Sequence, residues 1–167
     1  MSNNTIIRQV EKKDNSALSE MIKCVFEEHD APLTGTVYSD ASTNYLYNVF
    51  QQPKSILWVV EMNGSVLGCC GVFPTDGLPD GHAELVKFYL SKDIRGLGIG
   101  KQLMEQSIIS ATELGYKKLY IESFPQFSKA VRIYEKIGFR KINHALGNSG
   151  HTACDIWMVK ELEQINV

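Results

Sequence analysis

Residues 95–101 form the glycine-rich stretch Arg95-Gly96-Leu97-Gly98-Ile99-Gly100-Lys101. It lies between an apolar run typical of a β-strand, 83–90, and an amphipathic helical pattern that begins near residue 99. Such a turn suits a pyrophosphate, because glycines let the backbone approach closely and a helix start offers unpaired N–H groups to an anion. Arg95 and Lys101 add positive charge at the same place.

Two familiar phosphate-binding loops do not match this stretch. A P-loop requires Ser or Thr directly after its Gly-Lys pair, and here Gln102 follows Lys101. The dinucleotide fingerprint is spaced G-x-G-x-x-G and lies early in a βαβ unit, whereas this chain has G-x-G-x-G past its middle. A structural turn without any ligand is the other interpretation of these glycines.

The segments around the glycine turn predict a β-α-β-α unit with a right-handed crossover. Apolar residues recur at helical spacing from 99 to 114, and Gly115 is a plausible helix stop. A strand is expected at 118–122, and a second helix at 128–137 ends at Gly138.

Two motifs in this unit resemble the GNAT superfamily of N-acetyltransferases. The first is Arg95-Gly96-x-Gly98-x-Gly100, and the second is Ala130-x-x-x-Tyr134-x-Lys136-x-Gly138-Phe139. The resemblance covers roughly residues 83–142. It implies that acetyl-CoA is the cosubstrate, with its pyrophosphate on the glycine turn and its pantetheine arm between two splayed parallel strands. The residues implied to bind it are Phe88, Tyr89, Leu90, Arg95, Gly96, Leu97, Gly98, Ile99, Gly100 and Lys101.

The sequence departs from the family pattern at one position. Many members carry Asn three residues before the alanine of the second helix, and this chain has Phe127 there. A side-chain contact of that Asn with CoA is therefore not carried over.

The whole chain, 1–167, is predicted to form one α/β domain: a mixed, mostly antiparallel sheet with helices on both faces. Asn63-Gly64 is the strongest hairpin signal and joins strands expected at 55–61 and 65–73. Following the family, the two central parallel strands, 85–90 and 118–122, splay apart in a V. The other expected elements are a strand at 6–10, a helix after Asp14 or Asn15, a short helix near 42–50, and strands at 139–143 and 154–160.

Composition narrows the function classes. A net charge of −2 gives no electrostatic case for nucleic acid or a membrane surface as partner. No apolar stretch approaches 20 residues, and residues 1–5 lack the features of a signal peptide. The four cysteines show no C-x-x-C spacing and the four histidines are scattered, so no metal site is expected. We expect a cytoplasmic protein, and a homodimer is left open.

Glu84 is the candidate general base for attack of an amine on the thioester. Strand alternation puts it on one face with Val86, Phe88 and Leu90, and apolar surroundings should raise its pKa toward neutrality. Some members of the family carry a catalytic glutamate at the corresponding position. Glu122 on the neighbouring strand and a water chain are alternatives, and a purely structural carboxylate is another interpretation.

Tyr134 is the candidate general acid, which the family signature places near the CoA sulfur. It also fits the apolar face of its helix, so a core tyrosine is the competing interpretation. Backbone groups of 88–90 would bind pantetheine and stabilise the oxyanion.

The acceptor side carries no family motif, and the resemblance implies only that residues 27–50 and the loop 144–152 shape its pocket. Tyr38, Asp40, Tyr45 and Tyr47 are predicted to form an aromatic and acidic pocket for a cationic amine, unless the tyrosines only seal the core. The sequence thus predicts an acetyl-CoA-dependent N-acetyltransferase acting on a small primary amine. The alternatives are a CoA-binding regulatory domain without turnover, a peptide or protein N-acetyltransferase, and an enzyme using a longer acyl-CoA.

Overall fold

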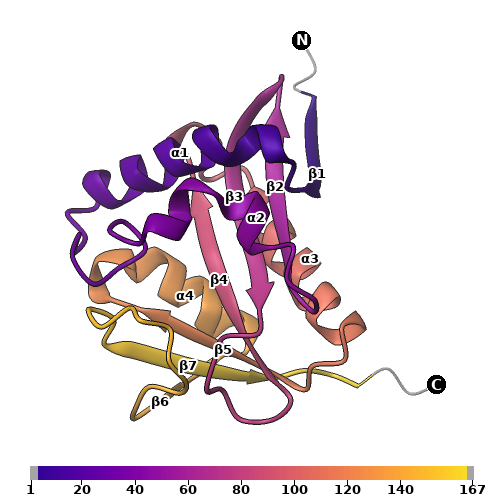
Figure 1. Ribbon diagram of the computed structural model, residues 1–167, viewed down its shortest axis with the longest axis vertical. Coiled ribbons are helices and arrows are strands. Elements are labelled where there is room, and N and C mark those ends of the chain that lie inside the picture. The colour runs from indigo at the N-terminus through magenta and orange to yellow at the C-terminus, as the bar shows by residue number, and fades with distance from the viewer. Residues whose placement is uncertain (1–3, 165–167) are drawn as a thin grey trace.

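A computed structural model describes residues 4–164, in which seven strands form one twisted sheet in the order β1-β2-β3-β4-β5-β7-β6 (Figure 1). Every neighbouring pair is antiparallel except β4 and β5, which run parallel. This confirms the predicted mixed, mostly antiparallel sheet. The strands are β1 (Thr5–Gln9), β2 (Ile56–Met62), β3 (Ser65–Phe73), β4 (His82–Leu90), β5 (Lys118–Ser123), β6 (Arg140–Ile142) and β7 (Ile156–Glu161).

Helices cover both faces of the sheet, as predicted. One face is packed against α1 (Asn15–Glu28) and α2 (Leu46–Val49), and the other against α3 (Ile99–Glu113) and α4 (Ser128–Ile137) (Figure 1). Each face has its own apolar cluster, so the sheet is buried on both sides. No helix within residues 4–164 is long and apolar enough to cross a membrane.

The bounds of most elements lie within a few residues of those expected from the sequence. The β2–β3 hairpin turns at Asn63 and Gly64, whose φ angles of +50° and +84° are those that a type I′ turn requires. The helix expected near 42–50 is instead interrupted at Tyr45. A 3₁₀ turn (Ala41–Asn44) precedes that residue and α2 follows it, because Tyr45 has the non-helical φ of −143°.

The two parallel strands splay apart as expected. They pair only where His82–Glu84 lies beside Lys118–Tyr120, and both strands continue beyond that point. The open part of the V lies between the C-terminal halves of β4 and β5 (Figure 1).

A β-bulge in β4 changes which residues share a face. Cys69 of β3 pairs with Tyr89 and Gly71 pairs with Val86, so two residues of β4, 87 and 88, oppose one residue of β3. Lys87 in the bulge has a φ of +56°. Val86 and Tyr89 therefore pack on the side of α1, while Phe88 and Leu90 pack on the side of α3. The expectation that Glu84 shares a face with Phe88 and Leu90 is wrong, because strict alternation stops at the bulge.

Candidate active site

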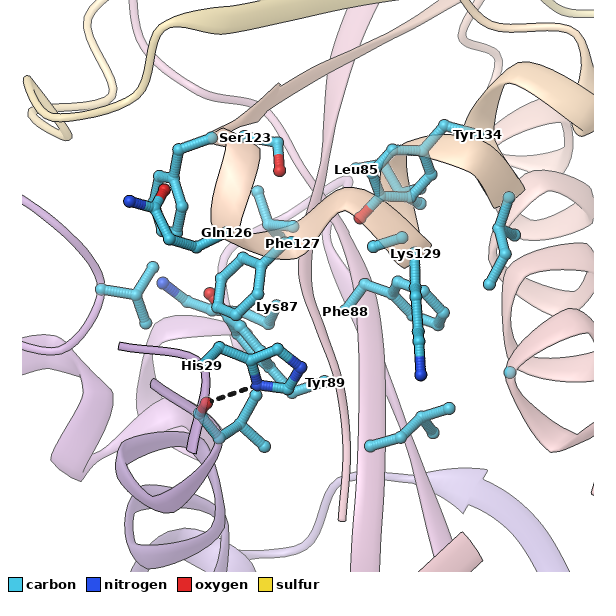
Figure 2. Close-up of a pocket in the computed structure, with 18 of the residues that line it drawn as sticks. His29, Leu85, Lys87, Phe88, Tyr89, Ser123, Gln126, Phe127, Lys129 and Tyr134 are labelled. Atoms are coloured by element: carbon cyan, nitrogen blue, oxygen red, sulfur yellow. Dashed lines mark hydrogen bonds between the residues drawn. The ribbon is translucent and has the colours of Figure 1, made fainter. Parts of the chain in front are cut away.

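A cavity of about 680 Å³ occupies the open V between β4 and β5. It runs from the glycine turn at the start of α3, past α4, to the loop that carries His151. Figure 2 shows side chains from α1, β4, β5 and α4 converging on it. The sequence-predicted residues that line it are Glu84, Phe88, Tyr89, Leu90, Arg95, Gly96, Gly98, Gly100, Lys101, Tyr134 and the alternative base Glu122.

The glycine turn has the geometry of an anion site. Gly96 and Gly98 both have φ of +78°, a conformation that glycine adopts without strain, and a Cβ on either would meet no atom within 4 Å. The N–H of Gln102 donates to the Gly98 carbonyl at 3.4 Å, so the N–H groups that precede it belong to the unpaired first turn of α3. Gly100 serves packing instead, because a Cβ there would lie 2.9 Å from a Leu90 methyl. The pyrophosphate of an acyl-CoA therefore fits this turn.

Two residues of the turn direct their side chains elsewhere. Leu97 is 58% exposed and Ile99 is buried in the core on the α3 side, and neither side chain lines the cavity. Any contact of these two residues with a ligand would therefore come from the backbone.

Arg95 connects the turn to two other elements. Its Nε donates to the Leu90 carbonyl at 3.0 Å, and its Nη2 forms an ion pair with Glu28 of α1 at 2.7 Å. The guanidinium is thus fixed at the mouth of the cavity, between the end of β4 and the end of α1.

Glu84 is a buried carboxyl group, only 5% exposed. Burial raises its pKa from 4.5 to about 7, against the hydrogen bond that it accepts from the Thr75 hydroxyl, and the neighbouring charge of Glu122 raises the pKa further. A carboxylate with a pKa near neutrality has the protonation behaviour of a general base at physiological pH.

Tyr134 reaches the cavity from α4 with its ring 6.0 Å from that of Phe88 (Figure 2). It is buried, and burial raises the pKa of its phenol, so the hydroxyl keeps its proton at neutral pH. Its hydroxyl makes no hydrogen bond with any residue in 4–164, which leaves the proton free for a ligand.

Comparison with known proteins identifies the family. Residues 20–139 match the model of the acetyltransferase (GNAT) family. The chain belongs to that family. An uncharacterized N-acetyltransferase of Escherichia coli, YjgM, is 35% identical over 94% of this chain and 95% of its own length. A GNAT family acetyltransferase of Staphylococcus aureus has the same fold, with a TM-score of 0.82 at 18% identity over 95% of this chain and 99% of its own.

A third comparison concerns the cosubstrate. The structure of yncA, a putative acetyltransferase of Salmonella typhimurium, was solved with its cofactor acetyl-CoA. It matches 99% of this chain and 98% of its own length, with a TM-score of 0.75 at 20% identity. This GNAT chain is therefore an acetyltransferase with the fold of a protein that holds acetyl-CoA.

The predicted acceptor pocket of this GNAT protein is wrong in its residues. Tyr38, Asp40, Tyr45 and Tyr47 do not line the cavity. Tyr38 donates its hydroxyl to Glu27 at 2.8 Å, and Tyr45 is nearly half exposed. The prediction failed because aromatic residues close in sequence diverge once a 3₁₀ turn and a short helix separate them. The wall on this side is formed by Val25, Thr36, Val37, His151 and Cys154.

Asp40 still influences the cavity, but through another residue. One oxygen accepts from the Ser42 N–H at 2.9 Å and caps the 3₁₀ turn, while the other lies 3.2 Å from Nε2 of His151. Burial lowers the pKa of His151, so the ring is neutral at pH 7. No pattern in the sequence signals this contact.

The bulge residue Lys87 is a cavity-lining cation that sequence reasoning missed. It is half-buried, and burial lowers its pKa. Phe127 departs from the family pattern, and the sequence assigned it no function. Its ring lies edge-on to Phe26 and to His29, each at 5.3 Å between centroids, and forms an aromatic wall of the cavity.

Proposed function

We propose that this GNAT acetyltransferase moves the acetyl group of acetyl-CoA onto the primary amine of a small molecule. The observation that carries the proposal is the convergence, in one cavity, of three features. They are a glycine turn suited to a pyrophosphate, a buried carboxyl with a pKa near 7, and a buried protonated phenol. The acetyl-CoA held by the Salmonella protein of the same fold supports the choice of cosubstrate.

The cosubstrate would supply an activated thioester. The first-turn N–H groups of α3 and the Arg95 guanidinium would hold its pyrophosphate, because both present donors at the mouth of the cavity. The pantetheine arm would follow β4, where the splay leaves the backbone groups of 88–90 without a partner strand on the side of β5.

The residues on either side of the thioester would move two protons. A primary amine arrives as an ammonium with a pKa near 10, and Glu84 takes one proton from it. The amine nitrogen then bonds to the acetyl carbon as the carbon–sulfur bond breaks. The departing sulfur takes a proton from the Tyr134 hydroxyl, and the second amine proton restores that phenol through solvent. Glu122 remains the alternative base.

The test is release of free thiol from acetyl-CoA in the presence of amino acids, polyamines, aminoglycosides and peptides, with CoA binding followed separately by calorimetry. The proposal expects thiol release with at least one small amine. Binding of CoA without turnover on any amine would instead indicate a CoA-binding regulatory domain, and turnover on peptides alone would indicate a peptide N-acetyltransferase.

A further inference from the structure

The side chain of Lys87 and one carboxylate oxygen of Glu122 lie at the cavity without a partner among the residues that the structure describes. Among residues 4–164, the ammonium of Lys87 forms no ion pair and no hydrogen bond. Oε1 of Glu122 is buried and likewise has no hydrogen-bond partner. Both residues line the cavity. Buried polar groups are nearly always paired, because an unpaired one loses its hydrogen bonds to water without replacing them, so these two groups point to a ligand that satisfies them.

Lys87 is unpaired because the carboxylates around it are already engaged. Asp40 accepts from the Ser42 N–H and lies 3.2 Å from His151. Glu84 accepts from Thr75 and has a pKa near 7, so it is only partly ionised at neutral pH. These two carboxyl groups and Cys69 are the groups whose charges act on Lys87. The amino group of Lys87 therefore faces the cavity with its N–H donors available for a ligand.

The position of Lys87 is fixed by the backbone. Its φ of +56° lies in the left-handed region, which is strained for a non-glycine residue. The bulge persists because β3 pairs with β4 on both sides of it, at Val86 and at Tyr89. Strand pairing thus offsets the strain, and it holds the lysine side chain at the edge of the V.

We propose that the acceptor is an amine that carries its own carboxylate, an α-amino acid or a close analogue. Its carboxylate would bind Lys87 and its ammonium would bind Glu122, beside the proton acceptor Glu84. This deepens the proposed function and rests on it. Figure 2 shows Lys87 and Gln126 on the side of the cavity away from Tyr134, so the carboxylate would lie far from the phenol that serves the leaving sulfur.

The same arrangement disfavours the other amine classes. A polyamine or an aminoglycoside would bring a second cation toward Lys87. The N-terminus of a peptide has an amide in place of the carboxylate and would leave Lys87 unpaired. The walls beside these groups are apolar, formed by Val25, Phe26, Val37 and Phe127, and suit the side chain of an apolar amino acid.

The experiment compares each of the apolar standard α-amino acids with its own carboxamide. The amide keeps the amine and the side chain but removes the negative charge. We expect kcat/KM for the acid to exceed that for the amide by about 10- to 100-fold, the range of one charged hydrogen bond. Lys87→Met should reduce that ratio to about one. The ratio is the readout, because the charge of Lys87 also acts on Glu84 and its loss would affect acid and amide alike. The matched control is Lys141→Met, an exposed lysine on β6 outside the cavity, which should preserve the ratio.

A second variant separates the two contacts. Glu122→Gln should raise KM for acid and amide alike and keep their ratio, because it weakens the ammonium contact that both share. Equal turnover of acid and amide by the wild-type protein, or an unchanged ratio in Lys87→Met, would overturn the proposal, as would a preference for polyamines or peptides.

Binding distinguishes failure of this inference from failure of the proposed function. If CoA binds but no amine releases thiol, the proposed function fails, and calorimetry of the same acids and amides on the CoA-saturated protein decides the acceptor question. Binding of the acid in preference to the amide, lost in Lys87→Met, supports the proposal. Equal binding, or binding of neither, rejects it.

Discussion

Replacing Glu84 by glutamine tests the burial and the chemistry of the same carboxyl group. In the folded protein this carboxyl keeps its proton up to about pH 7, whereas its ordinary pKa is 4.5. Between those two pH values the native state binds more protons than the unfolded state, so stability falls as pH rises. The difference in pKa corresponds to a loss of about 3 kcal/mol, complete above pH 7. Glu84→Gln has no carboxyl group to ionise and should escape this loss.

The measurement is the free energy of unfolding in urea at pH values from 4.5 to 8. We expect the stability of Glu84→Gln relative to wild type to rise by about 3 kcal/mol across that range. The matched control is Glu113→Gln at the exposed end of α3, for which the difference from wild type should not follow this pattern. A pH-independent difference for Glu84→Gln would show that the carboxyl is not held protonated by burial.

The same variant reports on catalysis. If Glu84 takes the ammonium proton, kcat/KM of the wild type should rise with pH through an apparent pKa near 7, and that limb should vanish in Glu84→Gln. If Glu84→Gln shows the stability change but keeps the rate and the pH dependence of kcat/KM, the carboxyl is held protonated by burial but is not the base. The base would then be Glu122 or water.

Three further substitutions test other parts of the site. Gly98→Asp puts a negative charge at the start of α3 and should weaken CoA binding in calorimetry by at least about tenfold. The control Gly115→Asp is equally strained, at a φ of +90°, and should keep CoA affinity, so equal losses in the two variants would refute a pyrophosphate site. Tyr134→Phe should lower kcat by about 100-fold with little change in CoA affinity. The control Tyr116→Phe removes a hydroxyl that donates to a backbone carbonyl and should leave kcat unchanged. Wild-type turnover in Tyr134→Phe would mean that Tyr134 is only a core residue. Asp40→Ala should lower the free energy of unfolding in urea by about 1–2 kcal/mol, because the side chain that caps the Ser42 N–H is lost. Asp40→Asn keeps this cap and should lower it less. Identical values for the two variants would mean that the cap contributes nothing.

Much of the fold could be predicted because its signals are local. Asn63-Gly64 fixes the hairpin, since the turn needs two positive φ angles in succession. Gly98 and Gly138 mark the start of α3 and the end of α4 for the same reason. The apolar periodicities of α1 and α3 needed only a window of a few turns.

On the acceptor side the family resemblance implied the two segments that shape the pocket, 27–50 and 144–152, but the contacts between them could not be predicted, because they join distant parts of the chain. His151 and Asp40 are 111 residues apart and meet only because two loops fold over the same edge of the cavity. The sequence offered Glu122 as an alternative base, but only the packing around it shows that one of its oxygens lacks a partner.

The sequence by itself determined the glycine turn, the two family motifs and the order of the elements, because each depends on neighbours along the chain. The tertiary structure alone decided the faces of β4. Its bulge lies where β4 has one residue more than β3 between two paired positions, and the sequence of 82–90 contains no pattern that predicts a bulge. That single extra residue separates Glu84 from Phe88 and Leu90 and brings Lys87 to the cavity, since the side chains of a strand alternate only while its pairing stays in register.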